Sequence, residues 1–445
     1  MKKLLALVMA LAVAATLFVG CGSSDSSSEA TSSKADSQES KGDESKEDAS
    51  SEDKADDSQQ DTPVDDGTAP ADAPFDPASG ITENMLNRSI KFEGDTSRLA
   101  AKLKEAYNPD GGKKITKVAF LGDSITAGSG ADNSANSFAN KVFAWFTENI
   151  NEFSKPVNAG IGATDSYLGV HRVDKDVIAQ DPDFIFIEFI NDCADDQFYK
   201  ATMDSLVRKC LAAPTQPAVV LVEMSLKGGG NCQDQHMVAA EAYNVPLLSY
   251  HDAITPEINA GNFSFDDISG DGTHPNDIGH GWVADIIINF LEKVQADADN
   301  AAEPTAFDPA TPSPTGDKYK NATIFDAENG DMTVNMDENW DQQSTPWNFK
   351  NGWSTADGGT ITFEMEFKNL GMMYYKSTKG DAGIVTVNID GEDVKQVDGD
   401  FTGGWGSYGT NVEVYTSDET AKHTVTVTVN EGERQYFEVL AWLVS

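Results

Sequence analysis

Apolar residues follow two different patterns along the 445-residue chain, and the pattern changes near residue 319. Before that point, short continuous apolar runs alternate with stretches in which apolar residues recur every three or four positions. Continuous runs of this length, rich in β-branched residues, are typical of strands that a parallel sheet buries on both faces. They predict strands at 118–121, 184–190, 218–224 and 246–248. The periodic stretches predict helices over 138–150 and 282–290, so the first half should be a three-layer α/β domain whose chemistry lies at the strand C-termini.

Beyond residue 319 apolar and polar residues alternate with a period of two, which indicates half-buried strands of an antiparallel sheet. This alternation is clearest at Ile361, Phe363, Met365, Phe367, Val425, Val427 and Val429. The run 385–389 leads into Asp390-Gly391, a dipeptide typical of hairpin turns. These features predict an all-β, jelly-roll-like sandwich.

A proline-rich segment separates the two patterns, with prolines at positions 304, 309, 312 and 314. Such segments act as stiff spacers between domains. We therefore expect the α/β domain to span residues 77–297, the linker 298–318 and the β-sandwich 319–445.

The first 20 residues carry two lysines and then an apolar run, which is the layout of an export signal. Cys21 follows Phe18-Val19-Gly20, which resembles a bacterial lipobox, so we expect lipid attachment at Cys21 and a location on the outer face of the membrane. The alternative is an uncleaved signal anchor with an incidental cysteine. Residues 21–76 are rich in Ser, Asp and Glu and poor in large apolar residues, which predicts a disordered tether.

The formal net charge is -41, and the acidic excess continues beyond the tether. Such a surface repels phosphate backbones, so we expect no nucleic-acid partner. Beyond Cys21 only Cys193, Cys210 and Cys232 remain, which argues against a disulfide scaffold. Cys210 and Cys232 can still pair, although three free thiols are favoured. None of the six histidines has a close metal-ligand spacing, so we expect neither a metal nor an organic cofactor.

The predicted strand 118–121 ends in Gly122-Asp123-Ser124-Ile125-Thr126, which places a serine at a strand-to-helix corner. Glycine allows a sharp turn there, and the positive end of a helix stabilises negative charge that develops nearby. Gly-Asp-Ser alone also forms ordinary turns and helix caps, so this segment needs partners before it indicates catalysis.

Two later segments supply such partners. Asp271 and His274 lie three residues apart on one predicted loop, where the carboxylate can orient the imidazole while the other ring nitrogen faces a serine. The glycine-containing loop 158–164 and Asn191 lie between these segments in the chain. A tetrahedral oxyanion needs two or three fixed donors, and a backbone N–H with an asparagine amide can provide them.

Together these segments resemble, in composition and order, the four blocks of the SGNH or GDSL-type hydrolase superfamily over residues 85–295. The resemblance implies that Ser124 is the nucleophile, His274 the general base and Asp271 its orienting partner. It also implies an oxyanion hole formed by the Ser124 and Gly162 N–H groups and the Asn191 side chain.

Two departures from the family pattern and several other polar residues need separate interpretation. Phe189 stands where the family usually has glycine, and the compressed second block leaves Ala163 as an alternative donor to Gly162. We expect Asp192 to brace its loop, and His171 with Arg172 to brace a helix start.

Five of the seven tryptophans lie in the predicted sandwich. Trp442 follows the strand alternation and should be a core residue. Trp340, Trp347, Trp353 and Trp405 lie in polar or glycine-rich contexts, where a flat ring can stack on a sugar or close the end of the sandwich. The domain loosely resembles the jelly-roll modules that accompany carbohydrate esterases.

These features together predict a surface-tethered serine esterase, specifically an O-deacetylase of acetylated polysaccharide that works through an acyl-enzyme. The expected partner is an acetylated polysaccharide or another glycan ester, with the membrane contacted through the lipid anchor only. A lipase or lysophospholipase of the same superfamily is one alternative. A glycan-binding surface protein with an inert hydrolase domain is another.

Overall fold

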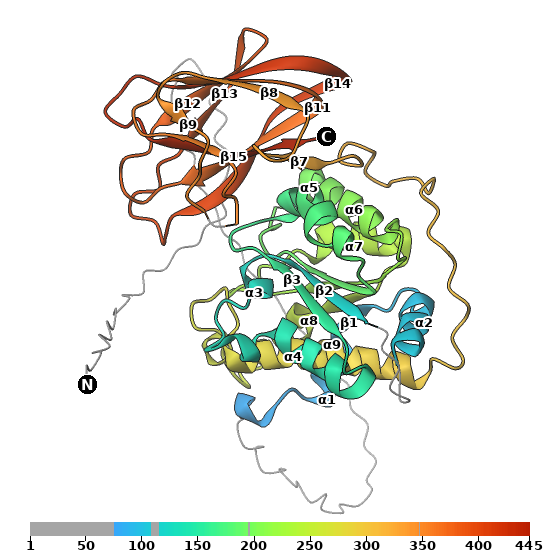
Figure 1. Ribbon diagram of the computed structural model, residues 1–445. Helices are drawn as coiled ribbons and strands as arrows, with labels where there is room; N and C mark the ends of the chain where they lie inside the picture. Colours follow the sequence, from blue (N-terminus) through green and yellow to red (C-terminus); the bar gives the residue numbers. More distant parts are fainter. Residues whose placement is uncertain (1–74, 108–114, 195, 347) are drawn as a thin grey trace, which may run out of the picture. The chain divides into compact units, whose positions relative to one another are not determined.

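The computed structural model describes residues 75–107, 115–194, 196–346 and 348–445. The expected signal peptide, Cys21, Trp347 and all but the last two residues of the expected tether lie outside these ranges. Phe75–Ser445 forms one compact unit that contains an α/β domain and an all-β domain (Figure 1). Among the described residues, no helix combines the length and the apolarity that a membrane-spanning segment requires.

The α/β domain is built on a six-stranded sheet with the order β1-β6-β5-β4-β2-β3. Strands β2 to β6 run parallel, and β1 pairs antiparallel with β6. The strands are β1 (Ile90–Phe92), β2 (Lys117–Gly122), β3 (Lys155–Gly160), β4 (Phe184–Glu188), β5 (Ala218–Glu223) and β6 (Leu247–Ser249). The four runs predicted from continuous apolar residues correspond to β2, β4, β5 and β6, so the parallel sheet is confirmed.

The two strands that the apolar pattern missed, β1 and β3, are the edge strands of this sheet. Ala159 is the one buried residue of β3, because the outer side of an edge strand faces solvent. An edge strand therefore needs no continuous apolar run. β1 has three residues, which is too short for a periodic signal.

Helices cover both faces of the sheet (Figure 1). Alternate residues of each strand point to opposite faces, so Phe120 and Val220 join one hydrophobic cluster while Leu121 and Leu221 join the other. The first cluster is covered by α1 (Glu83–Arg88), α2 (Ser97–Ala106), α4 (Phe138–Trp145), α8 (Tyr250–Asn259) and α9 (Asp277–Ala296). The second is covered by α5 (Ser166–Asp176), α6 (Gln197–Leu211) and α7 (Gln233–Tyr243). The two helices predicted from periodicity fall on α4, with the helical turn that follows it, and on α9.

The second domain is a nine-stranded antiparallel β-sandwich, as the alternation predicted. Its strands are β7 (Thr323–Phe325), β8 (Met332–Met336), β9 (Trp340–Asp341), β10 (Trp353–Thr355), β11 (Thr360–Lys376), β12 (Ile384–Ile389), β13 (Glu392–Asp398), β14 (Tyr408–Val429) and β15 (Phe437–Val444). The inward residues of β11 and β14, such as Phe363 and Val427, are fully buried. Asp390 and Gly391 both have positive φ and join β12 to β13 as the predicted hairpin turn.

The structure corrects two of the tryptophan predictions. Trp340 and Trp353 are 4% and 1% exposed, and both belong to the hydrophobic core of the sandwich. A ring with so little accessible surface cannot stack on a sugar, so the prediction of glycan contact is wrong for these two. Trp442 is a core residue, as predicted, whereas Trp405 is 71% exposed.

The two domains share part of one hydrophobic core. Tyr319, Met373 and Leu440 of the second domain belong to the same cluster as Tyr167 on α5. The approach is tight at Gly371, where an added β-carbon would lie 2.2 Å from the Tyr167 hydroxyl. The β-sandwich therefore completes the hydrophobic cover of α5, which begins directly after one of the predicted oxyanion segments.

Candidate active site

Ser124 lies at a tight corner between β2 and α3 (Ser124–Ala127). Gly122 precedes the corner, and a β-carbon there would lie 2.2 Å from Thr126 Oγ1 and 2.4 Å from the Glu188 carbonyl oxygen. Only glycine allows this close approach. Asp123 caps α3, because its side chain accepts a 2.9 Å hydrogen bond from the Ile125 N–H. The corner thus presents Ser124 at the carboxyl end of a central strand.

Ser124, His274 and Asp271 form a continuous chain of hydrogen bonds, with His274 in the middle. Ser124 Oγ lies 2.8 Å from His274 Nε2, and His274 Nδ1 lies 2.6 Å from Asp271 Oδ2. The other oxygen of Asp271 accepts hydrogen bonds from the backbone N–H groups of Thr273 and His274. With Nδ1 donating to the carboxylate, Nε2 is free to accept the Ser124 proton.

Asp271 is suited to remain ionised beside this histidine. Partial burial alone would raise the pKa of Asp271, but the hydrogen bonds from the His274 ring and from the two backbone N–H groups outweigh it and lower the pKa. The carboxylate therefore keeps its charge at neutral pH, where it can stabilise an imidazolium.

The predicted oxyanion donors border Ser124, but they differ in availability. As the first residue of α3, Ser124 has no acceptor for its N–H within the helix. Gly162 lies alongside, since a β-carbon on it would lie 3.7 Å from Ser124 Cβ. Asn191 Nδ2 donates to Asp123 Oδ2 and to the Thr164 carbonyl oxygen, each at 2.9 Å. Both Asn191 amide hydrogens are thus engaged, and the side chain must exchange one acceptor to bind an oxyanion.

Comparison with known proteins agrees with this geometry. Residues 120–282 match the GDSL-like Lipase/Acylhydrolase family. The α/β domain contains this match over most of its length. It is therefore a serine ester hydrolase domain, and its SGNH character is confirmed. No curated protein matches the chain.

Solved structures resemble the GDSL-like domain and the sandwich together. A two-domain esterase active on acetylated mannans is 29% identical, with a TM-score of 0.71 over 81% of this chain and 98% of that one. The same esterase co-crystallised with mannopentaose has the same identity and TM-score, and 97% of its chain is covered. The likeness spans both domains, so the architecture of this chain is carbohydrate-esterase-like.

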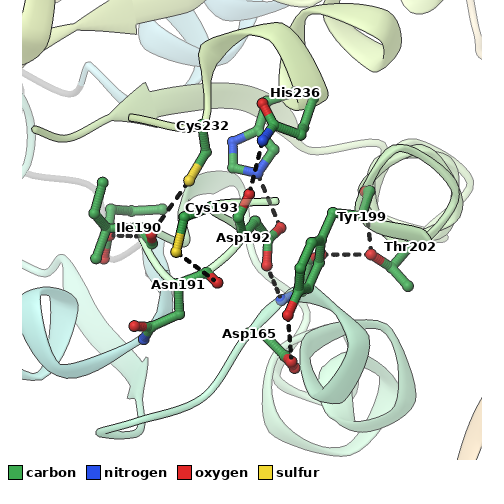
Figure 2. A network of polar contacts seen from close by, with 12 residues as sticks. Asp165, Ile190, Asn191, Asp192, Cys193, Tyr199, Thr202, Cys232 and His236 are labelled. Atoms are coloured by element: carbon green, nitrogen blue, oxygen red, sulfur yellow. Dashed lines mark hydrogen bonds and ion pairs between the residues drawn. The ribbon is translucent and has the colours of Figure 1, made fainter. Parts of the chain in front are cut away.

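A network of polar contacts surrounds the turn that carries Asn191 (Figure 2). The turn 190–192 follows β4, and Asp192 is completely buried in it. Asp192 Oδ1 accepts the Ser166 N–H at 2.9 Å, and its Oδ2 lies 2.9 Å from His236 Nε2. The expected loop-bracing role of Asp192 is confirmed, whereas its partner His236 carries no recognisable motif in the sequence.

The prediction for Arg172 is wrong. The residue lies inside α5 and does not brace a helix start; its guanidinium donates to the carbonyl oxygens of Gly122 and Ala159, at the ends of β2 and β3. The guanidinium therefore holds together the ends of the two strands next to Ser124. A buried arginine on an amphipathic helix gave no signal of this role, because its acceptors lie 13 and 50 residues away.

A pair of buried carboxyl groups lies beside this corner. Burial, followed by the charge of Glu188, raises the pKa of Asp123 well above its usual value. Burial likewise raises the pKa of Glu188, to about 7. The pair can therefore retain a proton at neutral pH, which limits the negative charge directly behind Ser124.

The structure also shows where Phe189 and the cysteines lie. Phe189, which replaces the usual glycine of the family, is buried against Gly169 of α5, where a β-carbon would lie 2.7 Å from its ring. Cys210 and Cys232 are buried free thiols and do not pair with each other, as favoured. In the described part of the chain, no group of three or more His, Cys, Asp or Glu side chains could hold a metal ion.

Proposed function

We propose that the protein is an extracellular serine esterase that removes O-acetyl groups from an acetylated polysaccharide. The contact of Ser124 Oγ with His274 Nε2 at 2.8 Å, with Asp271 behind the ring, carries the reaction class. The substrate class rests on the similarity, across both domains, to a two-domain esterase active on acetylated mannans.

The proposed mechanism uses only side chains and backbone groups of this chain. His274 accepts the Ser124 proton as Ser124 attacks the ester carbonyl, and the Ser124 and Gly162 N–H groups stabilise the oxyanion. The sugar hydroxyl leaves with the proton from His274, and an acetyl-enzyme remains. Water activated by His274 then releases acetate and restores Ser124.

The location is part of the same proposal. An export signal followed by Cys21 would anchor the chain by lipid on the outer face of the membrane, where polymeric glycans are accessible. Metabolic labelling with a palmitate analogue tests it: we expect label on the wild-type chain and none on Cys21→Ala. Labelling of both chains would contradict attachment at Cys21.

Acetate release from polymers tests the activity most directly. The protein without its first 21 residues would be incubated with acetylated mannan, acetylated xylan and peptidoglycan, with Ser124→Ala as the matched control. We expect acetate from an acetylated polysaccharide with the wild type and none with Ser124→Ala. Binding to glycan without turnover would support the inert glycan-binding alternative instead.

The matched family also includes lipases, and acyl-chain length separates that alternative. Each acyl methylene buried in a chain-binding groove would contribute about 0.8 kcal/mol, so kcat/KM of a lipase should rise steeply from acetyl to octanoyl esters. We expect the reverse order, with acetyl preferred and octanoyl near background. A rate that increases with chain length would favour the lipase.

Among the described tryptophans, Trp405 remains a candidate for glycan contact, and Trp347 stays an untested prediction. Deletion of 319–445 is a poor test, because it would also expose the core that Tyr167 shares with this domain. Trp405→Ala changes only an exposed ring, which packs on Tyr408 with centroids 4.7 Å apart. We expect it to lower activity on polymer and leave aryl acetate hydrolysis unchanged; equal rates on polymer would dismiss a glycan contact.

A further inference from the structure

The N-terminus of α7, with its N-cap residue Cys232, contacts the turn that carries Asn191 through three side chains. Cys232 Sγ donates to the Ile190 carbonyl oxygen at 3.2 Å, and Gln235 Nε2 donates to the Asp192 carbonyl oxygen at 3.0 Å. His236 reaches the Asp192 carboxylate from the same end of α7 (Figure 2). Three side chains at the N-terminus of α7 therefore hold the turn 190–192.

His236 is held on both sides by acids. Its Nδ1 lies 2.6 Å from Glu223 Oε1 at the end of β5, and its Nε2 lies 2.9 Å from Asp192 Oδ2. All three side chains are at most 2% exposed. Two carboxylates can accept from one imidazole only when both ring nitrogens carry hydrogen, so this arrangement favours the imidazolium form of the ring. Burial alone would lower the pKa of His236, but Glu223 and Asp192 outweigh burial and raise it to about 10.

Asp192 links His236 to both segments that carry predicted oxyanion donors, the turn 190–192 and the loop 162–166. Its Oδ1 accepts the Ser166 N–H at the end of the loop that contains Gly162, and the neighbouring Asn191 amide donates to Thr164 in that loop. The separation between the Gly162 and Asn191 donors thus depends on the position of Asp192. Donor positions matter most when the oxyanion forms, because the donors must already be in place.

We propose that His236 is a positioning residue for ester hydrolysis: as a buried cation bridging Glu223 and Asp192, it sets the spacing of the oxyanion donors on the turn 190–192 and the loop 162–166. It does not act as a proton carrier, because both ring nitrogens are occupied and it contacts neither Ser124 nor His274. This inference rests on the proposed function, since it assigns a role within the same reaction.

His236→Gln tests the proposal on a small aryl acetate, which needs no glycan binding. We expect kcat to fall about 10- to 10²-fold with KM nearly unchanged, because displaced donors weaken transition-state stabilisation rather than ground-state binding. His171→Gln is the matched control, since His171 is also buried but, among the described residues, hydrogen-bonds only to the Tyr167 carbonyl oxygen. It should leave kcat unchanged. A folded His236→Gln protein with wild-type kcat would overturn the proposal.

His236→Gln leaves two buried carboxylates without their cation, which destabilises the fold, so a charge-balanced variant is tested beside it. Glu223→Gln combined with His236→Gln removes one negative charge together with the positive one. We expect this double variant to fold and still to show the low kcat, because a flexible amide replaces the rigid bridge. Wild-type kcat in the double variant would also overturn the proposal.

A double-mutant cycle with Asn191→Ala shows whether His236 acts through the oxyanion donors. We expect a much smaller effect of His236→Gln in the Asn191→Ala background than in the wild type. An equal effect in both backgrounds would mean that His236 acts elsewhere and would contradict the proposal. If wild-type turnover does not depend on Ser124, the proposed function itself fails, which is a distinguishable result.

Discussion

His274 and His236 both contact an aspartate, at 2.6 Å and 2.9 Å. They differ in their exposure to solvent and in the partner of the second ring nitrogen. The His274 and Asp271 side chains are 25% and 56% exposed, and the second nitrogen of His274 faces Ser124. His236 is 2% exposed, and its second nitrogen faces another carboxylate. One pair lies at the surface of a loop, and the other lies between the sheet and a helix.

The difference teaches that a carboxylate–histidine contact does not define a role by itself. A general base must be able to gain and lose a proton near neutral pH, which requires one nitrogen directed at a reacting group. A histidine between two buried carboxylates keeps its proton and serves as a fixed cation. Accessibility and the number of acid partners therefore separate the two histidines, and the following predictions test that separation.

The largest expected effect is on the exposed histidine. His274→Ala should reduce hydrolysis of an aryl acetate by about 10⁴-fold or more, as should Ser124→Ala, because members of such a unit depend on one another. Steady-state kinetics with circular dichroism as a folding check would measure it. Retained activity in either folded variant would remove the assignment of the nucleophile and base.

A smaller loss is expected at the aspartate of the same pair. Asp271→Ala should be roughly 10²-fold less damaging than His274→Ala, because water can reach this half-exposed position and the base itself remains. The comparison needs kcat of both variants on the same ester. Equal losses would show that Asp271 contributes more than orientation of the ring.

Asn191→Ala should lower kcat by roughly 10²- to 10³-fold with little change in KM, since its amide matters mainly when the oxyanion forms. Both hydrogens of that amide already form hydrogen bonds in the structure, so the variant also tests whether these bonds are kept during the reaction. If Asn191 keeps its bonds to Asp123 and Thr164 throughout the reaction, the variant should lose stability rather than kcat. Unfolding measurements beside the kinetics distinguish the two results.

The smallest expected effect is a pH dependence of stability that distinguishes two buried histidines. The pKa of His236 rises from 6.5 to about 10 on folding, so the stability it contributes is present below pH 6.5 and is lost as the pH rises through 10. Burial lowers the pKa of His171 to about 3, so its contribution is present above pH 6.5 and is lost as the pH falls toward 3.

Denaturant unfolding across the pH range measures both contributions. His236→Gln should flatten the decline of the unfolding free energy on the alkaline side, whereas His171→Gln should change the slope only on the acidic side. Alkaline slopes that are identical in the wild type and His236→Gln would contradict the charged state of His236.

Prediction from the pattern of residues worked where local chemistry is decisive. β2, β4 and β5 are continuous apolar runs because central strands are buried on both faces, and the alternation in β11 reflects one buried face. It failed for the edge strand β3, which lacks a continuous apolar run because most of its residues are exposed or half-buried. It also failed for Trp340 and Trp353, since a polar neighbourhood in sequence does not reveal that a ring turns inward.

The sequence by itself determined the alternation of strands and helices in the first half, the change to a β pattern in the second half and the segments that carry Ser124, Asn191, Asp271 and His274. Each of these depends on residues that are close in the chain. Only the tertiary structure decided that His236 lies between Glu223 and Asp192, 13 and 44 positions away, or that Asn411 of the sandwich bonds to Asp165 at the start of α5, 246 positions away. Such partners meet because burial of the surrounding apolar surface brings their elements together, and a buried charge is then stable only where an opposite charge meets it.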